Sequence, residues 1–138
     1  MIKQDFISKY IQELAKTLAR IIALEVGNSD EGFLIIFNQM LQSYYKIDDH
    51  QLDVLLQEEP SRDQFLLADE LKKKNQLAFM KAIRIYLNQP SIDKAKAAFE
   101  VLKRIESNQS GIFQFPTAED QTIATERKFI AEKMANIE

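Results

Sequence analysis

Residues 76–106 read QLAFMKAIRIYLNQPSIDKAKAAFEVLKRIE, which is the pattern of two helices separated by a short break. Apolar residues recur every three or four positions on both sides of the break, so each segment has one apolar helical face. In the break, Pro90 cannot continue a helix and Ser91 is a good N-terminal cap. The stretch is therefore predicted to form an antiparallel helical hairpin. Its apolar positions are Leu77, Phe79, Met80, Ile83, Tyr86 and Leu87, then Ala95, Ala98, Phe99, Leu102 and Ile105.

This hairpin resembles one repeat of the tetratricopeptide family. In that family an aromatic residue, a tyrosine, a large residue, an alanine and a phenylalanine occupy the offsets filled here by Phe79, Tyr86, Ile92, Ala95 and Phe99. The reason for these residue types is steric. Small Ala95 lets two antiparallel helices approach, while Tyr86 and Phe99 fill the space around the contact. The turn glycine of the family is missing, and Pro90 stands there instead.

The first 45 residues contain a looser copy of the same frame. A helix is predicted over residues 3–26, and Gly27 ends it because glycine readily takes the left-handed conformation of a helix C-terminus. The next helix, residues 33–45, is apolar on nearly every side, which predicts that it forms the middle of the core. Gly27 falls at the turn-glycine offset and Gly32 at the small-residue offset. Gly32 is therefore predicted to be a packing glycine that allows close approach of helices.

The remaining segments supply connecting helices and a C-terminal helix. Ser61 is predicted to cap one connecting helix, and whether residues 61–88 form one helix or two stays open. Residues 72–74 are three lysines, predicted to be a solvated C-terminal turn that complements the helix dipole, with a phosphate or nucleic-acid patch as the alternative. Residues 117–120 resemble a capping box with Asp120 in place of the usual Glu or Gln. The helix that follows has a sparse apolar stripe of Ile123, Ile130, Met134 and Ile137.

The predicted fold is all-α, a single domain over residues 1–138 made of tetratricopeptide-repeat-like antiparallel helical hairpins with about five to seven helices. Its parts are a first hairpin over 3–45, connecting helices over 46–75, the repeat-like hairpin over 76–106, and a loop with the C-terminal helix over 107–138.

A second resemblance extends over much of the chain. It rests on Asp5-Phe6-Ile7, Leu14-Ala15, Leu18-Ala19, the Gly27 turn and the stretch FLLADEL at residues 65–71. This set is similar to a family of small uncharacterised bacterial proteins, a domain of unknown function. Members of that family are all-helical and repeat-like, so the resemblance implies a fold and no activity.

Composition excludes several classes of catalytic site. The chain has no Cys and one His, which excludes thiol nucleophiles, thiolate metal sites and sites with two imidazole ligands. Three isolated glycines leave no glycine-rich phosphate loop. His50 follows Asp48 and Asp49, a pattern more typical of a helix start than of a metal or acid–base site. The chain is therefore predicted not to be an enzyme, with no catalytic residue, metal or cofactor.

Charge and hydropathy bear on partners and location. A net charge of −3 lacks the basic footprint of a nucleic-acid binder. The longest apolar run, residues 33–37, is too short to span a bilayer, and charged residues interrupt the first 25 residues throughout. We therefore expect a cytoplasmic protein that engages neither membrane nor nucleic acid.

The pattern favours a helical protein–protein interaction module. The concave offsets of the tetratricopeptide family correspond here to Leu77, Met80, Arg84 and Leu87. Such an apolar wall with one arginine suits an amphipathic helix bearing a carboxylate. That helix could come from a protein or peptide partner, or from the chain's own C-terminal segment, guided in by Phe113 and Phe115. The alternative function is a structural protein that associates with itself as a homodimer through the last helix.

Two adjacent tyrosines end the helix predicted over residues 33–45. One of them, Tyr44 or Tyr45, is expected to be buried, and the other to lie at the surface with its hydroxyl in water. The alternative is that they form the aromatic edge of a binding groove.

Overall fold

The computed structural model describes residues 2–23, 30–108 and 116–137, with side chains from residue 8 onward. Within these ranges every regular element is helical and six are α-helices, which confirms the predicted all-α class and helix number. Gly27, Phe113 and Phe115 lie outside the described residues. The elements are α1 (Ile2–Ile22), α2 (Asp30–Met40), the π-helical turn η1 (Leu41–Tyr45), the 3-10 turn η2 (Leu52–Leu56), α3 (Pro60–Leu66), the 3-10 turn η3 (Asp69–Leu71), α4 (Lys72–Asn88), α5 (Ile92–Ser107) and α6 (Ala118–Ile137).

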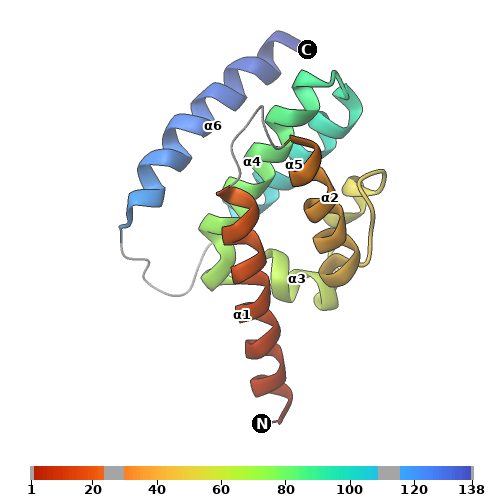
Figure 1. Ribbon diagram of the computed structural model, residues 1–138, viewed down its shortest axis with the longest axis vertical. Coiled ribbons are helices and arrows are strands. Elements are labelled where there is room, and N and C mark those ends of the chain that lie inside the picture. The colour runs from red at the N-terminus through yellow and green to blue at the C-terminus, as the bar shows by residue number, and fades with distance from the viewer. Residues whose placement is uncertain (1, 24–29, 109–115, 138) are drawn as a thin grey trace.

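Helix α4 is the centre of the fold, and it contacts α1, α2, α5 and α6 (Figure 1). Its partner α5 is antiparallel to it, since Lys72 at the start of α4 donates to the carbonyl of Asn108, just after α5, at 2.8 Å. Ala95 and Ala98 of α5 are fully buried, as is Tyr86 of α4. Small buried side chains of this kind allow two helices to pack closely.

The expectation that residues 33–45 form the middle of the core is only partly met. Phe33 and Phe37 are fully buried, but Ile35 between them is 55% exposed. Helix α2 therefore buries one side against α4 and leaves the other side in solvent. The long apolar run arises because α2, whose last residue Met40 is buried, continues into η1, where Leu41 and Tyr45 turn inward.

A buried polar link holds η1, α3 and α4 together. The Tyr45 hydroxyl donates to Asn75 Oδ1 at 3.1 Å, and Asn75 Nδ2 donates to the carbonyl of Phe65 at 3.2 Å. Asn75 and Tyr45 are both fully buried. Burial raises the pKa of Tyr45, so its hydroxyl remains protonated and able to donate.

The open question about residues 61–88 has a definite answer, because α3 ends at Leu66 and α4 begins at Lys72. The predicted cap of the first segment is wrong by two residues. Glu59 is the N-terminal cap of α3, and its carboxylate accepts from the Ser61 amide at 3.3 Å. Pro60 takes the first helical position, where its missing N–H costs nothing.

Gly32 is not the packing residue that the sequence predicted. It is exposed in the first turn of α2, and a Cβ built there meets no atom within 4 Å. The repeat frame misplaced it because the offset assumed that this face of α2 meets another helix, whereas this face is turned to solvent.

Gly32→Ala should therefore raise the free energy of unfolding by about 0.5–1 kcal/mol, since alanine loses less backbone entropy in a helix. Urea unfolding followed by circular dichroism measures the change. A loss of stability instead would show that close approach at Gly32 is needed after all.

Candidate functional site

The wall predicted from the sequence lies on α4, and α6 runs along it in the same direction (Figure 1). Leu77 and Met80 are buried, Leu87 is half-buried, and Arg84 is partly exposed between them. The structure therefore brings all four predicted residues to one face, although Leu77 and Met80 offer little free surface. Two small hollows remain along the contact. One of about 190 Å³ lies beside Met80 and Thr122, and one of about 330 Å³ beside Leu87 and Phe129.

Arg84 makes the central polar contact between α4 and α6. Its Nη1 donates to both carboxylate oxygens of Glu126, each at 2.9 Å. The guanidinium also lies 4.1 Å from the centroid of the Phe129 ring. One arginine thus binds a carboxylate and an aromatic face of the same helix, a combination that a lysine could not reproduce.

The lysine triplet begins α4 instead of ending a helix, so the predicted dipole role is wrong. Cations are unfavourable at a helix N-terminus. Acidic residues in the first turn of α6 offset this cost, with Lys73 3.1 Å from Asp120 and Lys74 3.5 Å from Glu119. The three lysines therefore contact groups of the chain itself, which leaves little uncompensated positive charge to bind a phosphate.

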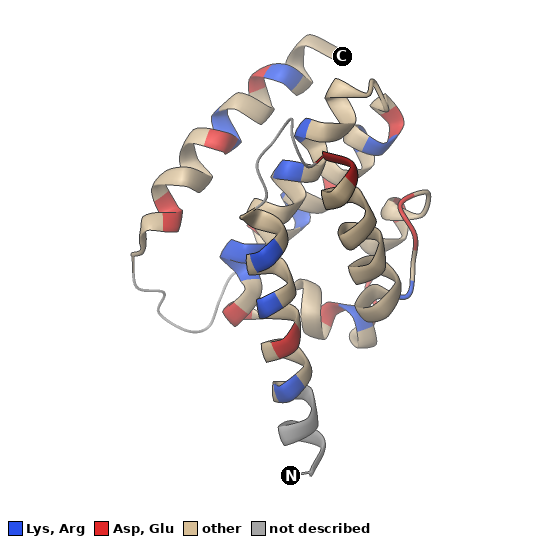
Figure 2. Cartoon of the chain, viewed as in Figure 1, with Lys and Arg blue, Asp and Glu red and all other residues tan. Residues whose placement is uncertain are grey.

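Helix α4 has five cationic residues and no acidic one (Figure 2). The side of α6 that meets α4 supplies Glu119, Asp120 and Glu126 in return. The two helices are therefore complementary in charge along their contact, although α6 also carries cations elsewhere. A further ion pair joins α6 to α5, between Arg127 and Glu106 at 2.6 Å.

The apolar part of the α6 contact is narrow, as its sparse stripe predicted. Ile130 and Met134 are the buried residues of α6, while Ile123 and Ile137 are partly buried against the core. Phe99 of α5 is also only partly buried, and its ring lies 5.0 Å from the Arg127 guanidinium. Phe99 therefore faces α6 and does not fill the α4–α5 contact. The predicted capping box is confirmed, because Asp120 accepts from the Thr117 amide at 2.8 Å.

A separate hollow, here named the aromatic pocket, lies between α1, η1 and α3. It encloses about 510 Å³ and is lined by Tyr10, Glu13, Ser43, Tyr44, Lys46, Ser61, Gln64 and Phe65. The tyrosine prediction is confirmed, because Tyr45 is fully buried and Tyr44 stays at the surface. The contribution of α1 was missed. Tyr10 and Glu13 lie outside the apolar stripe of their helix, and no local signal relates them to Tyr44.

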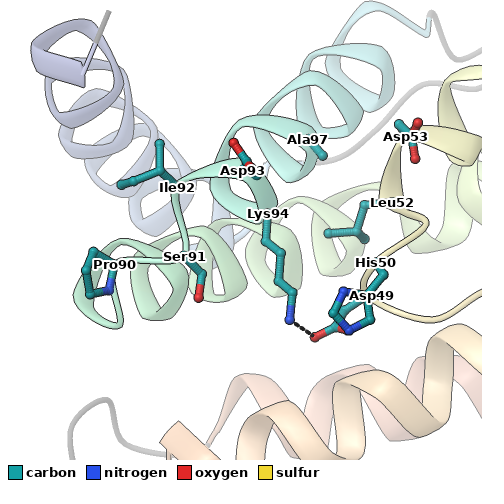
Figure 3. A pocket seen from close by; sticks show the side chains of 10 residues that line it. All are labelled: Asp49, His50, Leu52, Asp53, Pro90, Ser91, Ile92, Asp93, Lys94 and Ala97. Carbon is teal, nitrogen blue, oxygen red and sulfur yellow. Dashed lines mark hydrogen bonds and ion pairs between the residues drawn. The ribbon is translucent and has the colours of Figure 1, made fainter.

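Another hollow, of about 660 Å³, is polar and lies between η2 and the start of α5. Figure 3 shows Lys94 reaching Asp49 from α5, with a separation of 3.0 Å, and His50 beside the pair. His50 is 77% exposed, and its Nε2 lies 3.8 Å from Asp49 Oδ1. Asp49 also accepts from Asn38, so its role is to hold the turn.

Within the ranges that the structure describes, no three His, Cys, Asp or Glu side chains lie together so that they could hold a metal ion. In the same ranges no helix has both the length and the apolar character needed to cross a membrane. Comparison with protein-family models, curated proteins and solved structures gave no match. The site must therefore be interpreted from its own geometry.

Proposed function

We propose that this chain is a non-enzymatic protein-interaction module whose α4 wall holds an amphipathic helix bearing carboxylates. The observation that carries this proposal is the contact in which Arg84 Nη1 donates to both carboxylate oxygens of Glu126, each at 2.9 Å, in the middle of an apolar wall. Hydrogen bonds between charged partners are stronger than neutral ones, so this contact adds binding energy and places the carboxylate of a bound helix at the guanidinium. A partner helix with a carboxylate at that position meets the same guanidinium and the same apolar residues.

In the chain itself, α6 is the occupant of this wall. Only Ile130 and Met134 of its described side chains are fully enclosed, and its other contacts with α4 are ion pairs and half-buried side chains. Exchanging α6 for a competing helix therefore exposes little apolar surface. A helix held in this way is suited to reversible binding.

The proposal includes a tetratricopeptide-like stack of α4, α5 and α6. Two features support it. The antiparallel α4–α5 pair packs through the small residues Ala95 and Ala98, and α6 returns to the direction of α4, as the first helix of a following repeat would. In repeat proteins the first helices of successive repeats form the concave binding surface.

The test uses the full chain and a labelled synthetic peptide of residues 116–137 as the competing helix. Tethered α6 occupies the wall of the wild-type chain, so the peptide should bind weakly. Glu126→Arg in the chain sets two cations against each other and should free the wall, raising peptide affinity about tenfold or more. Adding Arg84→Glu to that variant restores an internal ion pair and removes the guanidinium, so affinity should fall back.

Glu132→Arg is the matched control, since Glu132 is exposed on α6 and makes no ion pair within the described chain. It should leave the wild-type affinity unchanged. Fluorescence anisotropy measures binding, and equal affinity for all four chains would contradict the proposal. Sedimentation velocity tests the alternative homodimer. A doubled mass that Glu126→Arg abolishes and the double variant restores would assign the wall to a second copy.

A further inference from the structure

The aromatic pocket is lined by Tyr10 and Glu13 of α1 and by no described residue of α6. Helix α1 is the element whose N-terminal end extends past the rest of the fold (Figure 1). Tyr44 and Phe65 form one corner of the pocket, with ring centroids 5.5 Å apart and planes at 76°. Tyr10 of α1 is also part of the lining, and its side chain is 38% exposed. Three aromatic rings from three separate elements therefore line one open hollow.

The open polar groups of this pocket can all accept a hydrogen bond, except for the remaining N–H of Gln64 and the Lys46 ammonium. They include the Glu13 carboxylate, which can only accept, and the hydroxyls of Ser43 and Tyr44. No hydrogen bond or ion pair within the described residues reaches the Glu13 carboxylate; only its backbone carbonyl accepts, from Thr17. Gln64 Nε2 donates to the Ser61 carbonyl at 2.9 Å, and the Gln64 amide oxygen stays open to accept. Burial and then the negative charge of Glu13 raise the pKa of Tyr44, so the carboxylate lies close enough to act on that hydroxyl.

Lys46 is the one cation among the described residues of the lining, and it is already engaged. The Lys46 ammonium donates a hydrogen bond to the Ser43 carbonyl at 2.9 Å, at the C-terminus of η1. Its backbone is held in the left-handed conformation, with φ of 58°, which fixes the direction in which the side chain leaves the chain. Lys46 therefore lies at the edge of the pocket and does not neutralise Glu13.

We propose that the aromatic pocket binds the arginine side chain of a partner peptide. A guanidinium has five N–H donors and no acceptor, which suits a pocket whose open polar groups accept. Its flat face stacks on aromatic rings, and it is more weakly hydrated than an ammonium group. An anionic or purely apolar occupant would leave the Glu13 carboxylate unpaired. The pocket shares no residue with the α4–α6 contact, so this site and the proposed function can fail separately.

The test compares two probes of the same shape, N-acetyl-arginine amide and its uncharged isostere N-acetyl-citrulline amide. Each is titrated into the full isotope-labelled chain, and the ring signals of Tyr10, Tyr44 and Phe65 are followed by NMR. Arginine should shift these signals saturably, and citrulline should bind about tenfold more weakly.

Variants assign the binding to named groups. Glu13→Gln keeps the shape of the side chain and should weaken arginine binding about tenfold, and Tyr44→Leu should weaken it through the lost ring. Lys46→Met removes a like charge and should strengthen it. Glu132→Gln, on the exposed side of α6, is the control and should change nothing. Equal binding of both probes, no effect of Glu13→Gln, or weaker arginine binding in Lys46→Met would overturn the proposal.

Discussion

Phe37→Ala is expected to lower the free energy of unfolding by about 3–5 kcal/mol, the usual cost of deleting a buried aromatic ring. Phe37 is fully buried. Its ring stacks on Phe33 with centroids 5.4 Å apart, and it meets Phe79 of α4 edge to face at the same distance. Phe37 thus joins α2 to the central helix, and no neighbour can fill the space that alanine leaves without moving one of these rings.

Ile35→Ala on the same helix is the matched control for this change. Ile35 is 55% exposed, so its truncation should alter stability by no more than about 0.5 kcal/mol. Both variants are compared with the wild type by urea unfolding followed by circular dichroism. Equal effects of the two substitutions would mean that α2 does not pack on α4 through Phe37.

Asn75→Ala is expected to cost about 1–3 kcal/mol, because it leaves the buried Tyr45 hydroxyl without an acceptor. The Phe65 carbonyl loses the Asn75 side chain but still accepts from the Ala68 amide at 3.4 Å. Each unpaired buried group costs about 1–3 kcal/mol. The loss should appear as a lower urea midpoint with an unchanged slope, since the fold remains the same.

Two buried tyrosines provide an internal comparison for this network. Tyr45→Phe leaves Asn75 Oδ1 unpaired and should cost about 1–3 kcal/mol. The Tyr86 hydroxyl is buried and, within the described chain, has no hydrogen-bond partner. Tyr86→Phe should therefore leave stability unchanged or raise it, because it removes an unsatisfied polar group. Equal losses in the two tyrosine variants would argue against the Asn75 link.

Local patterns were sufficient to predict the helices and several of their ends. The period of residues 77–105 predicted the α4–α5 hairpin, because burying one apolar stripe requires a helix with that spacing. Thr117 and Asp120 predicted the start of α6, since the capping bond spans three residues of one segment. The adjacent pair Tyr44 and Tyr45 predicted one buried and one surface ring for the same local reason.

The sites were harder to predict, because they join residues that are distant in the chain. The triplet at residues 72–74 looked like a helix end. Only the structure shows that it begins α4 and pairs with α6, more than forty positions later. Glu13 and Tyr10 line the aromatic pocket because α1 packs beside η1 and α3, an arrangement that the sequence of α1 does not indicate. Arg84 was predicted to face a carboxylate on a helix. That the carboxylate belongs to Glu126 depends on α6 packing along α4, which the sequence does not reveal.

The sequence by itself therefore determined the all-helical class and the two helices of the central hairpin. Both depend on spacing within one helix, which the backbone geometry sets. The wall of Leu77, Met80, Arg84 and Leu87 was taken from the resemblance to the tetratricopeptide family, and its role in binding stays a prediction. The tertiary structure alone decided which surface each helix buries. Ile35 and Gly32 face solvent although the run around them is apolar, and α4 took the central position instead of α2. That choice depends on which helices are available to cover an apolar face, and periodicity within one helix carries no information about its neighbours.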